Sequence, residues 1–312
     1  MSVQIIKSDP ILKQLGELWT TTAKPEAESS GEGLLRACSM TLISFVDDEE
    51  DERVVTDTLG ELMHEHPSRS IIVRIRGGED FLESRVFAQC WKPFGHRQQI
   101  CCEQVQITAT MNHLQDVAAV IGPLAVPDLP RVILLGSARI VRAGALRKIL
   151  PLGDKIIVDS SRPGAPGFGE LGALLESGHI AGDLAWARLT ELRALIVQVL
   201  GDKVPQSITV EYIGSEAGPE TRYLEAWLAS GLPETVVKMK GIGGDGSGKL
   251  CALRIDEDTT ICLAKECATV VIGQLKQHAS LSANTVEELL YAELKIVVHD
   301  QVFERALNRI TA

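Results

Sequence analysis

The sequence predicts an α/β fold: an N-terminal mixed sheet with parallel strands covered by helices, plus a smaller C-terminal α+β domain. Three observations lead to this prediction. The length of 312 residues exceeds the size at which one hydrophobic core usually stops growing. Apolar strand patterns alternate with amphipathic helix patterns up to residue 200. Beyond that point, short strands are followed by two helices.

The N-terminal part begins with a helix predicted at residues 10–19 and a polar linker or loop at residues 20–33, which contains proline and glycine. The strands that follow are predicted at 40–46, 70–76, 86–91, 100–110, 131–135 and 155–158. The helices between them are predicted at 53–64, 113–121, 143–150 and 170–177, and a long helix begins at Asp183. The strands at 86–91 and 100–110 flank a loop with proline and glycine, so we expect an antiparallel pair.

The stretch from Gly201 to Pro205 interrupts this pattern, and we place the domain boundary there, with domains at residues 1–203 and 204–312. The second domain is predicted to contain strands at 208–213, 236–240, 250–255 and 260–264 and helices at 220–229, 286–296 and 301–310. Its glycine-rich segment at 241–248 approaches a phosphate-binding motif. Because strands are predicted on both sides, we interpret it as a hairpin loop.

Composition narrows the functional classes. Acidic residues exceed basic ones, 42 against 31, which gives a formal charge of −11 and no basic stripe for nucleic acid. The densest charge run, residues 47–52, is acidic and is expected to be a solvated loop at a helix N-terminus. We find no signal sequence and no apolar run near the ~18 residues that a membrane span needs. Seven cysteines without regular spacing are typical of a reducing compartment, so we expect a cytoplasmic protein.

The segment from Asp183 to Arg193 combines a helix cap with an unusual tryptophan. Asp183 provides the N-cap acceptor, and an apolar stripe runs along the predicted helix. Trp186 and Arg193 lie away from the centre of that stripe. Trp186 either packs against a neighbouring loop or, with Arg193, Arg188 and Asp183, forms an anchor for a partner protein.

Five ordered blocks of sequence carry a family resemblance. They are His66–Arg69, Cys101–Glu103, Pro123–Pro130, Ile156–Ser161 and Asp183–Arg193. In this order and spacing, the chain resembles the OpcA family of glucose-6-phosphate dehydrogenase assembly proteins. It departs from the usual family pattern at residues 134–136, where a Trp pair is common, and at Ala185, where Asn is common.

The resemblance implies a non-catalytic factor of the pentose phosphate pathway. Such a factor binds glucose-6-phosphate dehydrogenase, promotes its active oligomer and acts as an allosteric activator through protein–protein interaction. We expect no cofactor and no metal. We also find no Gly-x-Ser-x-Gly motif and no cysteine with a positioned histidine, so no catalytic residue is predicted.

A second hypothesis concerns the end of the strand at 155–158. Asp159, Ser160, Ser161 and Arg162 follow it, at the edge where open α/β sheets bind ligands. The region from Asp159 to Gly172 could therefore serve an enzyme or sensor for a sugar phosphate or nucleotide. The alternative is an ordinary turn in which Asp and Ser satisfy the local backbone.

Cys101 and Cys102 are adjacent on a predicted strand, so their side chains should point to opposite faces. One is expected in the core. The other could be a redox-sensitive thiol or could join Cys90 and His96 in a metal site, although those spacings match no zinc pattern.

Overall fold

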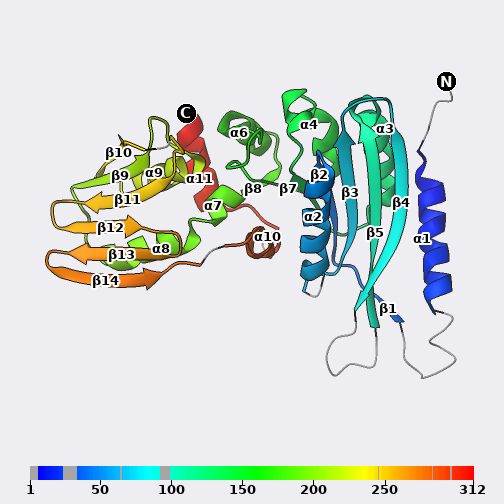
Figure 1. Ribbon diagram of the computed structural model, residues 1–312, viewed down its shortest axis with the longest axis horizontal. Helices are drawn as coiled ribbons and strands as arrows, with labels where there is room; N and C mark the ends of the chain where they lie inside the picture. Colours follow the sequence, from blue (N-terminus) through cyan, green and yellow to red (C-terminus); the bar gives the residue numbers. More distant parts are fainter. Residues whose placement is uncertain are drawn as a thin grey trace. The chain divides into compact units, whose positions relative to one another are not determined.

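The computed structural model describes residues 6–23, 34–63, 65–91, 99–244, 246–282, 284–295 and 297–312. The chain divides into two compact units, Met1–Val158 with Pro163–Pro166, and Asp159–Arg162 with Gly167–Ala312 (Figure 1). The first unit has a mostly parallel sheet covered by helices and the second has its own sheet, which confirms the predicted fold class. Within the described ranges, no helix is long and apolar enough to cross a membrane.

The sheet of the first unit has the strand order β1-β5-β3-β2-β6-β7, and β4 pairs with β5. Its strands are β1 (Leu34–Arg36), β2 (Met40–Val46), β3 (Ser68–Arg76), β4 (Leu82–Trp91), β5 (Gln99–Thr110), β6 (Arg131–Leu135) and β7 (Lys155–Val158). All these pairs are parallel except β4 with β5, which is antiparallel as predicted. All seven residues of β2 are buried, because parallel strands at the centre of such a sheet have both faces covered.

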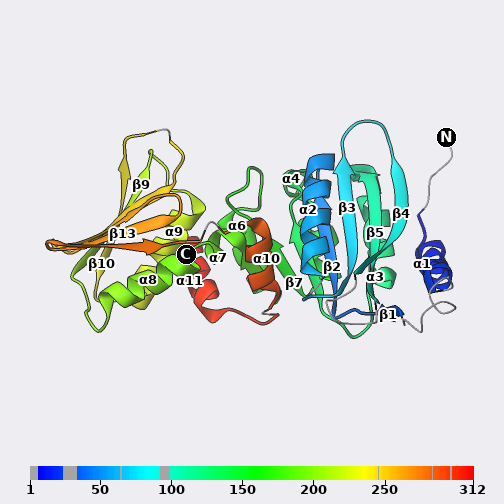
Figure 2. The ribbon, with the colours of Figure 1, turned by 60° about the horizontal axis from the view of Figure 1, so that its bottom comes forward.

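Helices cover this sheet on both faces (Figure 2). They are α1 (Ser8–Ala23), α2 (Glu49–Leu62), α3 (Leu114–Leu124), α4 (Ala138–Arg142) and α5 (Leu146–Ile149), with 3-10 turns at Met111–His113 and Leu150–Leu152. Asp48 caps α2, because its carboxylate accepts a hydrogen bond from the Asp51 amide at 2.8 Å. The acidic run, expected as a loop before a helix at residue 53, is therefore partly helical: residues 49–52 form the first turn of α2.

The consecutive parallel strands β5-β3-β2-β6-β7 have the order of a doubly wound dinucleotide-binding fold. The chain first builds outward from β2 through β3 to β5, and then returns to the other side of β2 with β6 and β7. In such folds the point beside the first strand, where the direction reverses, is the usual place for a ligand. This position lies at the carboxyl ends of β2 and β6.

The strand β5 is joined by side-chain links to both of its main neighbours, by a disulfide to β4 and by an ion pair to β3. Cys90 and Cys101 stand directly opposite each other and form a disulfide. Arg69 of β3 forms an ion pair with Glu103 of β5 and donates a hydrogen bond to the Leu124 carbonyl. Both charged side chains are almost fully buried, so each satisfies the other where water is excluded.

The second unit contains a sheet with the order β10-β9-β11-β12-β13-β14, in which only β9 and β10 run parallel. Its strands are β9 (Ser207–Ile213), β10 (Val236–Ile242), β11 (Leu250–Ile255), β12 (Thr259–Leu263), β13 (Cys267–Ile272) and β14 (Leu275–Ser280). The chain also forms the short β8 (Ile180–Asp183). One face of the main sheet supplies buried aliphatic side chains to the core, and the other is polar and solvated.

The helices of the second unit share an aromatic core. They are α6 (Phe168–Glu176), α7 (Leu184–Ala187), α8 (Thr190–Leu200), α9 (Pro219–Gly231), α10 (Val286–Leu294) and α11 (Gln301–Thr311). Tyr223 of α9 lies at its centre, with ring centroids 5.0 Å from Phe168, 5.8 Å from Trp186 and 5.7 Å from Phe303. These rings come from α6, α7, α9 and α11, so the core joins residues far apart in the sequence.

Four predictions from the sequence are wrong in detail. The long helix from Asp183 is two helices, α7 and α8, because the chain turns at Arg188 and Leu189. The predicted helix at 143–150 is α5 alone, preceded by α4. The chain divides before Gly167 and not near Gly201, because α7 and α8 belong to the second unit and Gly201 only ends α8. The segment at 241–248 is no hairpin, because β10 and β11 both flank β9.

Candidate functional site

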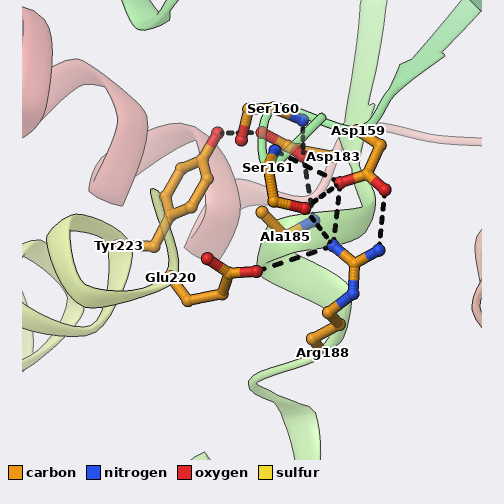
Figure 3. A network of polar contacts seen from close by, with 8 residues as sticks. All are labelled: Asp159, Ser160, Ser161, Asp183, Ala185, Arg188, Glu220 and Tyr223. Atoms are coloured by element: carbon orange, nitrogen blue, oxygen red, sulfur yellow. Dashed lines mark hydrogen bonds and ion pairs between the residues drawn. The ribbon is translucent and has the colours of Figure 1, made fainter. Parts of the chain in front are cut away.

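Asp159 and Arg188 form the centre of a polar network in the second unit (Figure 3). Asp159 follows β7, and Arg188 is the C-cap residue of α7. Arg188 donates from Nη1 to Oδ1 at 2.8 Å and from Nη2 to Oδ2 at 2.7 Å, which is the bidentate geometry of a strong ion pair. Ser161 donates its hydroxyl to Asp159 at 2.5 Å and accepts a hydrogen bond from Arg188 at 2.7 Å.

Burial works against the charge on Asp159, but the hydrogen bonds from Arg188 and Ser161 outweigh it and hold the pKa of Asp159 below its ordinary value. Conversely, its hydrogen bond to Asp159 raises the pKa of Arg188. Both groups therefore stay charged at neutral pH. Both carboxylate oxygens of Asp159 accept hydrogen bonds within the network, so Asp159 is not arranged as a free nucleophile or base.

Asp183 ties three segments together from a fully buried position. Its Oδ1 accepts hydrogen bonds from the backbone amides of Ser160 at 3.0 Å and Ala185 at 2.9 Å. Its Oδ2 accepts one from the Tyr223 hydroxyl at 2.9 Å. Asp183 caps α7 as the sequence predicts, and it also fixes the turn after β7 and the start of α9. Burial raises its pKa.

Glu220 is the third carboxylate of the network. It lies at the N-terminal end of α9, with Oε1 3.6 Å from Nη1 of Arg188. Burial raises the pKa of Glu220. No local pattern in the sequence marks Glu220 or Tyr223, because their positions depend on how α9 packs and not on any motif around them.

The four predicted partner-binding residues separate into two groups. Asp183 and Arg188 belong to the network above, whereas Arg193 stacks on Trp186, whose ring packs against Tyr223. Trp186 is only 3 % exposed, and its indole donates to Asp300 at 3.2 Å. Of the two hypotheses for Trp186, the structure therefore agrees with packing: the indole lies in the aromatic core and not at an exposed surface.

Arg193 covers that indole. Its guanidinium carbon lies 3.6 Å from the centre of the Trp186 ring, and its Nη2 donates to Thr190 at 3.1 Å. Burial lowers the pKa of Arg193 to about 10, which still leaves it charged at neutral pH. Arg193 thus stacks on the tryptophan as a cation on an aromatic face.

The remaining predicted residues are placed as follows. Ser160 and Ser161 belong to the network, while Arg162 is exposed at its margin. Cys101 is bonded to Cys90, and Cys102 is buried, with its pKa raised to about 11 by burial. The sequence allowed one of these two cysteines to be an accessible, redox-sensitive thiol, but both side chains are buried and Cys101 is bonded, so neither is an accessible thiol. His96 lies outside the described residues. Among those that are described, no cluster of three His, Cys, Asp or Glu side chains could hold a metal ion.

The loop after β2 has the opposite chemistry from a dinucleotide-binding loop. In the doubly wound fold, a glycine-rich turn at this position leads into a helix whose N-terminus receives the pyrophosphate. Here the turn is Asp47-Asp48 and the first turn of α2 contains Glu49, Glu50 and Asp51. These carboxylates would repel a pyrophosphate at the position where the fold usually binds one.

Two family descriptions match the chain over most of its length. Residues 60–173 match the glucose-6-phosphate dehydrogenase subunit N-terminal domain, and residues 180–307 match the C-terminal domain of the same subunit. The chain belongs to the OpcA family. This agrees with the resemblance seen in the sequence blocks, and the two matched regions meet near the division between the two compact units.

Two curated relatives share the family name. The chain is 28 % identical over 147 residues to an OxPP cycle protein OpcA of Synechocystis sp., covering 44 % of this chain and 31 % of the relative. It is 24 % identical over 198 residues to the OpcA protein of Nostoc punctiforme, covering 59 % of this chain and 42 % of the relative. The matches thus span less than half the length of these relatives.

A solved structure similar in fold is a biliverdin reductase from Synechocystis sp., crystallised with biliverdin and NADP+. Its TM-score is 0.49 at 11 % sequence identity, and the match covers 87 % of this chain and 97 % of that chain. A likeness at this level carries no argument about activity.

Proposed function

We propose that this protein is a non-catalytic assembly and activation factor that binds glucose-6-phosphate dehydrogenase and promotes its active oligomer. The observation that carries the proposal is the match of both regions of the chain to the two domains described for a glucose-6-phosphate dehydrogenase subunit. The names of the curated relatives, which refer to the OxPP cycle, support the same metabolic context.

The chemistry of the described side chains supports a role without catalysis. Asp159 and Asp183 are both engaged in internal hydrogen bonds, and the acidic turn after β2 disfavours a dinucleotide bound through its pyrophosphate. A partner that binds the assembled enzyme more tightly than its dissociated form shifts the equilibrium toward the assembled form by that difference in affinity. No turnover by the factor itself is required.

We further propose that Arg188 and Arg193 are the partner-facing part of the Asp183–Arg193 segment. Asp183 and Trp186 are buried, so they cannot contact a partner directly. They would instead hold this segment in its folded position. The Arg188 side chain keeps 26 % of its surface exposed, and Arg193 is half-buried. Arginine is enriched at the centres of protein interfaces, because its flat guanidinium combines stacking with several hydrogen bonds.

The proposal is tested by mixing the purified chain with the dehydrogenase of the same organism. We expect the chain alone to oxidise no glucose 6-phosphate with NADP+, and the mixture to have a higher specific activity than the dehydrogenase alone. Turnover by the chain at an enzyme-like rate, ~1 per second or more, would reject the non-catalytic role. Arg193→Gln should weaken the complex, whereas Arg305→Gln, an exposed arginine on α11, should not.

A further inference from the structure

A second polar feature lies in the first unit, at the carboxyl ends of its parallel strands. A cavity of about 430 Å³ is lined by the end of β3, the end of β5 and the helix α4 that follows β6. The side chains and backbone that matter here are Arg76, Gly77, Gly78, Asn112, Arg139 and Arg142. We call this cavity the arginine pocket. It lies at the sheet edge where ligands bind in open α/β folds.

The arginine pocket is basic in a protein whose formal charge is −11. Three arginines line it, and no acidic residue is found among its described lining residues. Arg76 Nε and Arg142 Nε donate only to backbone carbonyls, of Gly77 at 3.4 Å and Ala138 at 3.2 Å. Within the described part of the chain, neither of these two arginines forms an ion pair. The guanidinium of Arg76 also lies over the ring of Phe81, 4.7 Å from its centroid. Because stacking on a ring leaves the edge donors of a guanidinium unused, the charge of both arginines is available to a ligand.

Nearby carboxylates are held by other groups. Asp47 accepts hydrogen bonds from the Ser137 hydroxyl and the Arg139 amide, and lies 4.0 Å from Nε of Arg139. Asp80 accepts from His113 at 3.0 Å and from Thr110 at 3.1 Å. The carboxylates around the pocket are thus occupied by these hydrogen bonds. Among the described residues, they leave most of the N–H donors of Arg76, Arg139 and Arg142 without a carboxylate partner.

The two glycines that line the arginine pocket allow a ligand to approach the backbone closely. Gly77 lies against Arg139, since a Cβ there would be 3.1 Å from Nη1 of that arginine. Gly78 has φ +94° and open space where its side chain would be, so the backbone itself can face a bound molecule. The Asn112 amide nitrogen donates to Asp80 at 3.4 Å, which leaves its second N–H as a donor and its carbonyl oxygen as an acceptor for hydroxyl groups of a ligand.

We propose that the arginine pocket binds the phosphate monoester of a sugar. A planar guanidinium group can donate two parallel hydrogen bonds to two oxygens of a phosphate. Three such cations in one pocket favour a ligand with two negative charges, such as a phosphate monoester. The volume is near the lower end for small-molecule sites, which fits one phosphorylated sugar. The acidic turn after β2 excludes the pyrophosphate contact of the fold, so the monoester, and not a pyrophosphate, is the group recognised. A hexose phosphate and the ribose 2′-phosphate of NADP+ share this chemistry.

Calorimetric titration of the full chain with two matched pairs of probes tests the proposal. Glucose 6-phosphate is compared with glucose, and NADP+ with NAD+, at low ionic strength because salt screens such contacts. We expect saturable binding of at least one phosphorylated member and none of its unphosphorylated counterpart. The pair that shows this difference identifies the source of the phosphate. Equal binding within both pairs, or no binding of any probe, would overturn the proposal.

Variants of the pocket assign the binding to these residues. Arg142→Gln and Arg76→Gln should each raise the Kd of the bound probe by about tenfold, the typical effect of losing a hydrogen bond to a charged group. Arg147→Gln, an exposed arginine on α5 outside the pocket, should leave the Kd unchanged. Arg142 is exposed, so its substitution should not impair folding. An unchanged Kd in both pocket variants would place the binding elsewhere and reject the arginine pocket.

Discussion

Asp159 shows how a single residue connects the sequence to the fold of the second unit. It follows the strand β7, whose apolar run is readable from sequence, and its carboxylate meets Arg188 and Ser161 at hydrogen-bonding distance. Because Asp159 is 8 % exposed, most of the ion pair is removed from water. Breaking one partner of such a pair leaves the other charge without compensation.

Asp159→Asn should therefore destabilise the protein by about 2 kcal/mol. We expect less than the full cost of a fully buried pair, because Arg188 remains 26 % exposed to water. The free energy of unfolding in urea measures the loss. As a control, Glu50→Gln removes an exposed ion pair with Arg53 and should change stability by less than about 0.5 kcal/mol. If Asp159→Asn and Glu50→Gln lower the free energy of unfolding by similar amounts, burial does not make the Asp159–Arg188 ion pair more important than an exposed one.

The same substitution should change the pH dependence of stability. The pKa of Asp159 is lower in the folded state than the unfolded value of about 3.9. Its contribution is thus fully present above that unfolded pKa and is lost as pH falls through the lower folded pKa. The difference in free energy of unfolding between the wild type and Asp159→Asn should therefore become smaller as the pH falls below about 4. A difference that stays constant down to pH 2 would show that the charge of Asp159 is not involved.

Trp186 is expected to act through packing. Trp186→Ala should lower the free energy of unfolding by roughly 3 to 5 kcal/mol, because it leaves a cavity beside Tyr223 and Phe303. Val197→Ala, which truncates a side chain that is 57 % exposed on α8, should have little effect. Near-wild-type stability of the tryptophan variant, with weakened binding to the dehydrogenase, would restore the exposed-anchor interpretation.

The cysteines should differ strongly in reactivity. Cys262 is exposed, whereas Cys102 is buried and has a pKa raised to about 11, so little of it is the reactive thiolate at pH 8. Iodoacetamide should label Cys262 first in the folded protein and both thiols in urea, as measured by peptide mass spectrometry. Equally fast labelling of Cys102 without urea would mean that β5 is not packed as described.

At the scale of elements, two loops of the second unit approach each other so closely that glycine is required. A Cβ at Gly248 would lie 2.6 Å from the Gly218 nitrogen and 2.8 Å from the Glu216 oxygen, and its φ is +69°. At Gly273 φ is +57°, but no atom lies within 4 Å of the position of its Cβ. Alanine substitutions at these two glycines therefore distinguish two free-energy costs: that of a left-handed backbone alone at Gly273, and that of the same backbone with a steric clash at Gly248.

Gly273→Ala should cost about 1 kcal/mol, the usual penalty of a left-handed backbone. Gly248→Ala should cost about 3 kcal/mol, because the clash with rigid backbone adds to that penalty. Thermal or urea unfolding of both variants provides the comparison. If the two losses are equal, the loop before α9 and the loop before β11 do not pack as tightly as the structure indicates.

The elements that could be predicted from sequence are those with one strong local pattern. The strands β2, β6 and β7 have the predicted bounds, because a short apolar run between turns is typical of a strand buried on both faces. The strand β14 was missed because most of its residues are exposed and its sequence does not alternate. The strand β8 is short and contains glycine, so it has no apolar run from which a strand could be predicted.

The candidate site was predictable only in part, for the same reason. Asp159 and Ser161 could be placed at a strand end, and Asp183 at a helix cap, from local sequence. That Arg188 binds Asp159 required tertiary contacts, because the two are 29 positions apart. The arginine pocket gathers residues from β3, β5 and α4, and no local motif marks such a convergence.

At the scale of the whole molecule, the family match extends across both units, 60–173 and 180–307. We therefore expect both units to be needed for binding the dehydrogenase, which remains the central claim of the proposed function. The arginine pocket, if occupied by a sugar phosphate, would give the first unit a separate role in sensing a metabolite. The two roles can be tested independently, since one is measured with a small molecule and the other with a protein.

Sedimentation velocity of the cognate dehydrogenase, with and without this chain, tests the central claim most directly. We expect the mixture to sediment as a species larger than either protein alone, and its specific activity to rise in proportion to the amount of that species. Two independent boundaries at the positions of the separate proteins, with unchanged dehydrogenase activity at micromolar concentrations, would contradict the proposed function.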